Sequence, residues 1–334
     1  MSDSMSIPTN NAIPADRLAQ AIDIVQRLRE EIGRAIVGQQ TVVEQVLACC
    51  LAGGHVLLEG VPGLGKTLLV KALAKTFAGE FSRIQFTPDL MPADVMGHAV
   101  FDQRQQTFSI RKGPVFTHLL LADEINRAPA KTQSALLEAM QERQVTIEGE
   151  AHALEAPFMV LATQNPLESE GTYPLPEAQL DRFLIKARIA YPSEAEETAM
   201  LLAVTQERVG DALEVAQVRT LIKPETLVAL QQLVARIRVD EAVANYAVRM
   251  ARATREWPGV AVGAGPRGSI ALIRLARAMA LMAGRDYATP DDIKRVSLPV
   301  LRHRIALSPE SELDGLGADD VLAALIDSVA APRN

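Results

Sequence analysis

The 334-residue sequence is poor in aromatic and basic side chains. Phe, Trp and Tyr make up 4% of it, and 34 Lys and Arg residues are outnumbered by 41 Asp and Glu residues, giving a net charge of −7. A general nucleic-acid binder would present a basic face and rings on which bases stack. The composition therefore argues against that class, although a local basic pore could lie within an acidic average.

The sequence also lacks long apolar runs, cysteine pairs at framework spacing and clustered histidines. No uninterrupted apolar run approaches the roughly 18 residues that cross a bilayer, and residues 1–16 lack the basic-then-apolar pattern of a signal peptide. Cys49 and Cys50 are adjacent in an apolar run, which indicates core positions in a cytosolic protein rather than disulfides. We therefore predict a cytoplasmic protein without a membrane span or a zinc site.

Up to about residue 190 the sequence alternates between strand-like and helix-like patterns. Five apolar runs are typical of buried strands, at 55–59, 82–86, 118–123, 157–164 and 183–189. This alternation predicts an α/β fold with a parallel sheet covered on both faces. Two further stretches, 99–113 and 144–154, place strand-like runs around polar tips and are hairpin candidates outside the sheet.

Beyond about residue 192 the sequence is almost wholly helix-patterned. Ser193 and Glu196 have the spacing of a capping box that opens a helix. No convincing buried strand follows, so this part is expected to form a separate, smaller, all-α domain. We predict three parts: a flexible tail at 1–13, an α/β core at 14–192 and a helical domain at 193–334.

Residues 60–67, GVPGLGKT, match the phosphate-binding pattern in which two glycines flank four residues and Lys-Thr follows. Glycines let backbone N–H groups curve around phosphate oxygens, and the following helix adds its positive end. Lys66 would reach the β- and γ-phosphates, and the Thr67 hydroxyl would bind Mg²⁺. The match follows a predicted strand and precedes a predicted helix, which favours a phosphate loop over a plain glycine-rich turn.

Three polar residues lie where the next predicted strands end. Asp123 and Glu124 close one apolar run, and Asn165 closes the following one. At the carboxyl edge of a parallel sheet these side chains lie beside the phosphate loop. Asp123 would hold hydrated Mg²⁺, Glu124 would polarise an attacking water, and Asn165 would orient that water. Alone, the acidic pair could instead cap the next helix, and Asn165-Pro166 could be a turn.

Two arginines are candidates for offsetting charge on the γ-phosphate. Arg182 precedes the last predicted strand and would be an arginine finger offered to a neighbouring subunit, a role worth about 10³–10⁵ in rate. Its alternative is a surface ion pair with Asp181. Arg267 begins a predicted helix, where a cation opposes the helix dipole. We therefore interpret Arg267 as a contact to ATP from the helical domain, with a solvent-facing arginine as the alternative.

Taken together, these residues resemble the AAA+ ATPases and, more narrowly, the MoxR family. The likeness runs from about residue 20 to about 305. It is carried by IVGQ (36–39), LLEGVPGLGKT (57–67), QFTPDLMPADVMG (85–97), KGPVF (112–116), LLLADEINRAP (119–129), LLEAMQERQVTIEG (136–149), LATQNPLESEGTYPLPEAQLDRF (161–183) and GAGPRGSIAL (263–272).

The resemblance implies an αβα P-loop core with two hairpin inserts that face the pore of a ring, and a smaller all-α lid. Such rings are commonly hexamers with ATP between neighbours. The family resemblance also implies a chaperone-like ATPase acting on protein clients, often ones with a von Willebrand factor A domain. Two alternatives stay open: a nucleic-acid motor with the same insert, for which Arg111 and Lys112 are the best local case, and a chelatase-type ATPase subunit.

The resemblance further assigns residue roles. Asp123-Glu124 corresponds to Walker B, Asn165 to sensor 1, Arg182 to the arginine finger and Arg267 to sensor 2. Val37 and Gly38 fall where the family brackets the adenine. The other implied ATP contacts lie in the Walker A segment and the helix after it: Gly60, Pro62, Gly63, Leu64, Gly65, Lys66, Thr67 and Leu68.

Overall fold

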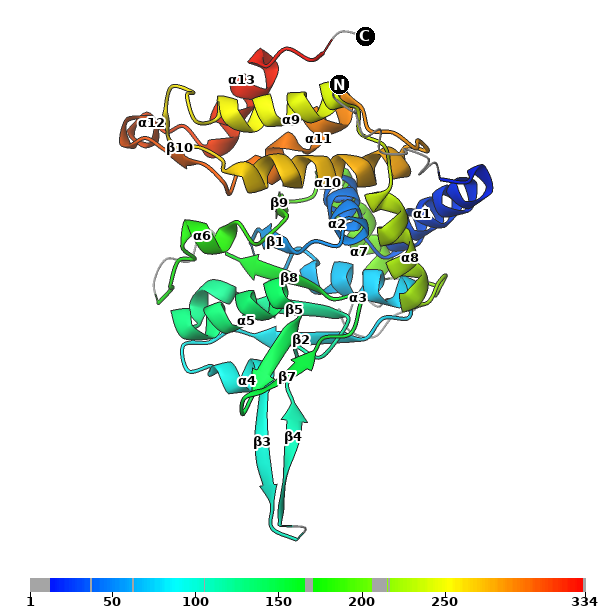
Figure 1. Cartoon of the computed structure of the whole chain (residues 1–334), viewed down its shortest axis with the longest axis vertical. Coiled ribbons are helices and arrows are strands. Elements are labelled where there is room, and N and C mark those ends of the chain that lie inside the picture. Colours follow the sequence, from blue (N-terminus) through cyan, green and yellow to red (C-terminus); the bar gives the residue numbers. More distant parts are fainter. Residues whose placement is uncertain are drawn as a thin grey trace, which may run out of the picture.

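The computed structural model describes residues 13–332, apart from Val37, Pro62, Gln105, 166–170, 206–214 and Ala216. All but the last residue of the predicted tail, 1–13, lie outside the described residues. The molecule is elongated, with a group of helices at one end, an α/β layer in the middle and a projecting hairpin at the other end (Figure 1).

Five parallel strands form the central sheet in the order β2-β5-β8-β1-β9. They are β1 (Val56–Glu59), β2 (Phe81–Gln85), β5 (Leu119–Asp123), β8 (Met159–Gln164) and β9 (Ile185–Arg188). All of β5 and nearly all of β8 are buried. Strands buried on both faces carry unbroken apolar runs rather than alternating ones, and the predicted parallel sheet is confirmed.

Helices cover both faces of this sheet and create two hydrophobic cores. One core joins β1 and β5 side chains to α1 (Ala15–Ala35), α2 (Gln40–Leu51) and α3 (Lys66–Thr76). The other joins the opposite face to α4 (Pro92–Met96) and α5 (Ala130–Glu142). Neighbouring strand residues divide between the cores, with Leu58 in the first and Leu57 in the second, because successive strand side chains point to opposite faces.

The two predicted hairpins are present outside the sheet. The first pairs β3 (Gly97–Asp102) with β4 (Thr107–Lys112) and projects away from the body (Figure 1). Phe101 and Phe108 face each other across it, with ring centroids 5.1 Å apart and exposed fractions of 48% and 74%.

The second hairpin pairs β6 (Gln144–Ile147) with β7 (Glu150–Ala153). Its turn residues, Glu148 and Gly149, have positive φ angles of 49° and 83°. Positive φ at both central residues is typical of the type I′ turn, which matches the twist of the flanking strands.

The part after β9 is helical, as predicted, and packs onto the first core. Ser193 and Glu196 form the capping box, since the Ser193 N–H and hydroxyl each donate to Glu196 Oε2 at 2.8 Å. A short ribbon of β10 (Val260–Val262) and β11 (Ala306–Leu307) is an addition that the sequence did not indicate, because strands of two or three residues have no detectable period.

No helix in the described ranges is long and apolar enough to cross a bilayer. The helices are α7 (Glu194–Thr205), α8 (Pro224–Ala235), α9 (Glu241–Ala253), α10 (Pro266–Met282), α11 (Pro290–Leu301), α12 (Pro309–Leu313) and α13 (Ala318–Ser328), with η1 (Ile125–Arg127) and α6 (Glu177–Leu180) before β9.

His55 ties three elements together immediately before β1. Its Nδ1 accepts a hydrogen bond from the Val160 N–H at 3.0 Å, so the proton sits on Nε2, which donates to the Met140 carbonyl at 3.1 Å. Burial lowers the pKa of His55 to about 4.

Mild acid should therefore weaken the fold through His55. Its unfolded pKa is about 6.5, so between pH 6.5 and 4 the unfolded chain binds more protons than the folded one, and stability falls as pH falls, by about 3 kcal/mol in total. Urea unfolding at pH 7.5 and 5 should show a smaller loss for His55→Gln than for the unmodified protein. His98→Gln, at an exposed position on β3, is the control. Equal pH dependence in all three proteins would contradict this account.

Candidate functional site

The phosphate loop joins β1 to α3 at the carboxyl edge of the sheet. Gly63 and Gly65 have φ angles of +86° and +78°, a left-handed conformation that side-chain-bearing residues rarely adopt. At Gly60, a Cβ would come within 2.8 Å of the Ile189 carbonyl oxygen, so only glycine allows the loop this close to the end of β9. Pro62 lies outside the described residues.

A cleft of about 310 Å³ opens beside the loop. Lys66 donates from Nζ to the Gly60 carbonyl at 2.5 Å. Burial lowers the pKa of Lys66, while the carboxylates of Asp123 and Glu124 act in the opposite direction. The cleft brings together most of the predicted site residues: Gly63, Gly65, Lys66, Thr67, Leu68, Asp123, Glu124 and Asn165.

Thr163 links the two acidic residues of the cleft. Its hydroxyl donates to Asp123 Oδ1 at 2.9 Å and accepts a hydrogen bond from the Glu124 N–H at 2.9 Å. Arg83 binds the other Asp123 oxygen, Oδ2, through Nε at 2.8 Å and Nη2 at 2.7 Å. Glu124 has a left-handed backbone, with φ 54°, and its carboxylate pairs with Arg127 at 3.1 Å.

Four residues of the cleft were missed from the sequence: Lys71, Arg83, Gln85 and Thr163. The strand order explains their presence, because β5 lies between β2 and β8 and Gln85 stands opposite Asp123 in the ladder. The sequence offered one signal for these residues: Thr163 is a polar residue within an otherwise apolar run. That Thr163 pairs with Asp123 depends on the strand order, which the local sequence pattern does not encode.

A smaller and more apolar hollow adjoins the cleft and shares Gly63, Gly65 and Leu68 with it. Leu64 lines this hollow, together with Ala35, Ile36, Gln39, Pro192 and Met200. Gly38, with φ +71°, lies beside it against α7, where an added Cβ would come within 2.8 Å of the Glu196 carboxyl group. Val37 lies outside the described residues. A mostly apolar hollow with a few polar groups suits a purine ring.

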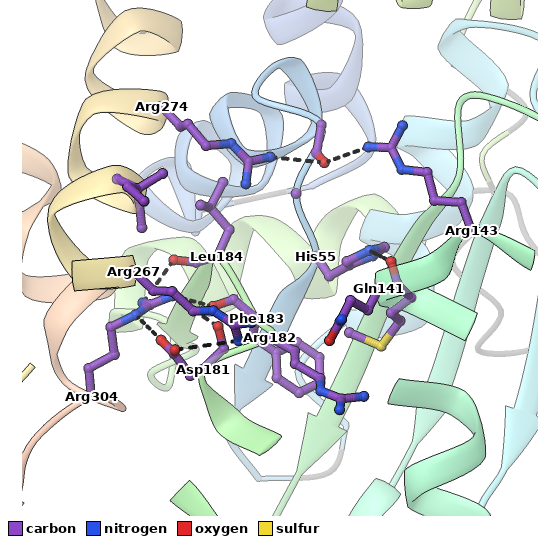
Figure 2. A pocket seen from close by; sticks show the side chains of 15 residues that line it. His55, Gln141, Arg143, Asp181, Arg182, Phe183, Leu184, Arg267, Arg274 and Arg304 are labelled. Carbon is purple, nitrogen blue, oxygen red and sulfur yellow. Dashed lines mark hydrogen bonds and ion pairs between the residues drawn. The ribbon is translucent and has the colours of Figure 1, made fainter. Parts of the chain in front are cut away.

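Arg182 and Arg267 do not line either of these spaces. They line a second pocket, of about 370 Å³, with Arg143, Arg274 and Arg304 (Figure 2). Residues 53–55 of this pocket precede β1 and residues 182–184 precede β9, so the pocket lies at the amino edge of the sheet. The four residues of β1 alone separate the two edges by about 13 Å.

Asp181 is the acidic residue of this arginine-rich pocket. It pairs with Arg304 at 2.8 Å and with Arg267 at 3.7 Å (Figure 2). Within the described part of the chain no acidic side chain pairs with Arg182, so the surface pair with Asp181 is not formed. Burial lowers the pKa of Arg304, while Asp181 acts to raise it.

The oxygen groups of the cleft fit a hard cation. The Thr67 hydroxyl and the Asp123 carboxylate are oxygen ligands of the kind that Mg²⁺ prefers, and Mg²⁺ usually needs only one or two of them beside substrate phosphates. Lys66, Lys71 and Arg83 supply positive charge around the same space. The cleft and the adjoining hollow therefore fit a nucleoside triphosphate with its metal.

Thr163 should stabilise this edge of the sheet through its hydroxyl. Thr163→Val keeps the shape but leaves the part-buried Glu124 N–H without its acceptor and Oδ1 of Asp123 without its donor, which should cost about 1–3 kcal/mol of unfolding free energy. Thr163→Ser keeps both hydrogen bonds and should lose clearly less. Urea unfolding measures the difference, and equal losses in the two variants would show that methyl packing dominates instead.

Comparison with known proteins gives a consistent family assignment. Residues 55–185 match the ATPase family associated with various cellular activities (AAA), and residues 252–325 match the AAA lid domain. Chaperone MoxR1 of Mycobacterium tuberculosis is 44% identical over 339 residues, spanning 98% of this chain and 88% of that protein. Protein MoxR of Methylorubrum extorquens is 30% identical over 338 residues, spanning 93% and 96%.

A solved structure from Cytophaga hutchinsonii superimposes with a TM-score of 0.87 at 39% identity, covering 95% of this chain and 98% of that one. This likeness extends the agreement from the sequence to the arrangement of the α/β core and the helical lid. The chain belongs to the MoxR family of AAA+ ATPases and hydrolyses ATP.

Proposed function

We propose that this protein is the protomer of a ring-shaped, Mg²⁺-dependent ATPase that acts as a chaperone on protein clients. The placement of Arg182 carries the ring proposal. Arg182 lies at the amino edge of the sheet, whereas Lys66 and the other cleft residues lie at the carboxyl edge. An arginine finger at this position serves a nucleotide only if the nucleotide is bound by a neighbouring copy.

The nucleotide would lie along the phosphate loop. The apolar hollow beside Leu64 and Gly38 would take the adenine, and the cleft would take the triphosphate. Gly60, Gly63 and Gly65 shape the loop, and the backbone from Gly63 to Leu68 would offer N–H groups to phosphate oxygens. Val37 is assigned to the adenine contact by family resemblance alone.

Hydrolysis would proceed by attack of water on the γ-phosphorus, with cleavage of the bond to the oxygen that bridges to the β-phosphate. Glu124 would polarise the water and accept its proton, and Asn165 would orient it. Lys66 would offset charge on the β- and γ-phosphates. Thr67 and Asp123 would hold Mg²⁺, which neutralises charge on the phosphate oxygens.

A neighbouring copy would complete the site with the arginine-rich pocket. Five arginines against Asp181 give this pocket a surplus of positive charge that suits a phosphate group. Arg182 and Arg267 would both reach the nucleotide across the subunit boundary, with Arg267 contacting it from the helical domain of the neighbouring copy. Repetition of this head-to-tail contact gives a closed ring when the rotation between copies closes, and we propose six subunits as in the resembling rings.

The client-facing surface would include the β3–β4 hairpin. Val100, Phe101, Phe108 and Ile110 expose apolar area there, and exposed apolar patches commonly mark interaction sites. The name of the Mycobacterium relative supports chaperone activity. Clients with a von Willebrand factor A domain follow from the family resemblance, and ATP dependence together with the free buried thiols of Cys49 and Cys50 favours the cytoplasm.

The nucleic-acid motor is the weaker candidate. It relies on Arg111 and Lys112 of β4, but Lys112 Nζ lies over the Phe116 ring, 5.0 Å from its centroid, and the strands next to the hairpin tip expose Phe101 and Phe108. Stimulation of ATP hydrolysis by DNA that disappears with added salt would favour this candidate over the chaperone. A chelatase-type subunit would be identified by its partner protein.

Binding and hydrolysis should be separable in this site. Lys66→Met should weaken ATP binding roughly 100-fold, because a charge-assisted contact to the phosphates is lost. Glu124→Gln should keep affinity within a few-fold while turnover drops about 10²-fold or more. Fluorescent ATP binding and phosphate release measure the two effects. Turnover by Glu124→Gln at the unmodified rate would exclude Glu124 as the residue that activates water.

Catalysis should be shared between neighbouring copies. Arg182→Ala should bind ATP normally and lose about 10³-fold in turnover. Mixing it with Glu124→Gln should restore measurable phosphate release, because some interfaces then combine an intact Glu124 with an intact Arg182. The control is a mixture of Glu124→Gln with Arg238→Ala, a variant of the lid surface that keeps both Glu124 and Arg182. It shows how mixing with Glu124→Gln subunits alone changes phosphate release. Full-rate hydrolysis by a strictly monomeric protein would refute the shared site.

A further inference from the structure

We propose that Arg83 is a stand-in cation for Asp123: it binds this carboxylate when Mg²⁺ and ATP are not bound and leaves it when they bind. Arg83 would then determine how much Mg²⁺ the protein needs. This inference rests on the proposed role of Asp123 in holding the metal, and it concerns a residue that the sequence did not single out.

Both oxygens of the Asp123 carboxylate are already engaged. Oδ2 accepts from Nε and Nη2 of Arg83 at 2.8 and 2.7 Å, and Oδ1 accepts from the Thr163 hydroxyl at 2.9 Å. A cation, or a water bound to it, therefore has to share an oxygen or displace a donor. The question is which of the two donors can move.

Thr163 is the fixed donor and Arg83 the mobile one. Thr163 is buried in the middle of the sheet and also holds the Glu124 N–H, so moving it would break two hydrogen bonds. The Arg83 side chain is 50% exposed and lines the cleft. It can rotate away from Asp123 without disturbing the core.

Electrostatics gives this exchange its direction. Asp123 is largely buried, and a buried carboxylate without a partner is costly, so this carboxylate needs another cation beside it when Mg²⁺ is not bound. Mg²⁺ would satisfy the same carboxylate with twice the charge, and a guanidinium on the same oxygen would then repel it.

A purely structural Arg83 would behave in the opposite way. If Arg83 stayed on Asp123 and oriented the remaining lone pairs of the carboxylate toward the metal, removing Arg83 would weaken Mg²⁺ binding. If Arg83 competes with the metal, removing Arg83 strengthens Mg²⁺ binding. The sign of the change in Mg²⁺ requirement separates the two roles.

The test is a Mg²⁺ titration of binding of a fluorescent ATP analogue, with Glu124→Gln in every protein to stop turnover and with saturating nucleotide. Arg83→Met should lower the Mg²⁺ concentration at half-maximal binding by about two- to fivefold, the range for a half-exposed ion pair. Its melting temperature without Mg²⁺ and nucleotide should fall and should recover when both are present. An unchanged or higher Mg²⁺ midpoint would overturn the proposal.

Two further variants complete the design. Arg83→Lys keeps the charge with one nitrogen and should give an intermediate midpoint; it also serves if Arg83→Met does not fold. Arg238→Met removes a matched arginine–aspartate pair, Arg238 with Asp286 at 3.4 Å, from the lid surface and should leave the midpoint in place. If the protein with Arg83 intact shows no Mg²⁺-dependent ATP binding, the proposed function fails; if it does and Arg83→Met is unchanged, only this inference fails.

Discussion

Parallel pairing of β5, β8 and β1 is the constraint on which the rest of this structure depends. Because the three strands run in the same direction, their carboxyl ends meet at one edge, and the residues that follow them converge there. This is why Lys66, Asp123-Glu124 and Asn165, which are far apart in the chain, share a cleft. The same pairing sends the residues before the strands to the opposite edge.

The two edges differ in charge as well as position. The carboxyl edge combines the phosphate loop with two carboxylates that are held by hydrogen bonds and ion pairs. The amino edge gathers five arginines and Asp181 in one pocket. A cleft shaped for a triphosphate and a cationic pocket on the reverse side are complementary surfaces, and this complementarity is the physical basis for the proposed shared site.

The lid is connected to the phosphate loop by ion pairs as well as by packing. Glu59, directly before the loop, pairs with Lys186 at 2.5 Å and with Arg188 at 2.9 Å. Burial would raise the pKa of Glu59, but these two cations outweigh it and the pKa is lowered. Arg188 also pairs with Asp319 in the first turn of α13. Asp319 forms a second ion pair with Arg302, which lies at the end of α11. The lid helices are therefore linked to β1, the strand that leads into the nucleotide site, through Arg188 of β9.

By itself, the sequence determined the features that depend on local pattern: the five strands, both hairpins, the capping box at Ser193 and the phosphate loop before α3. Tertiary structure alone decided which strands are neighbours. That choice brings Thr163 and Arg83 to Asp123 and places Arg182 and Arg267 away from Lys66 in the same chain. The reason is physical: periodicity and turn chemistry act over a few residues, whereas strand order is set by how whole layers bury their apolar faces.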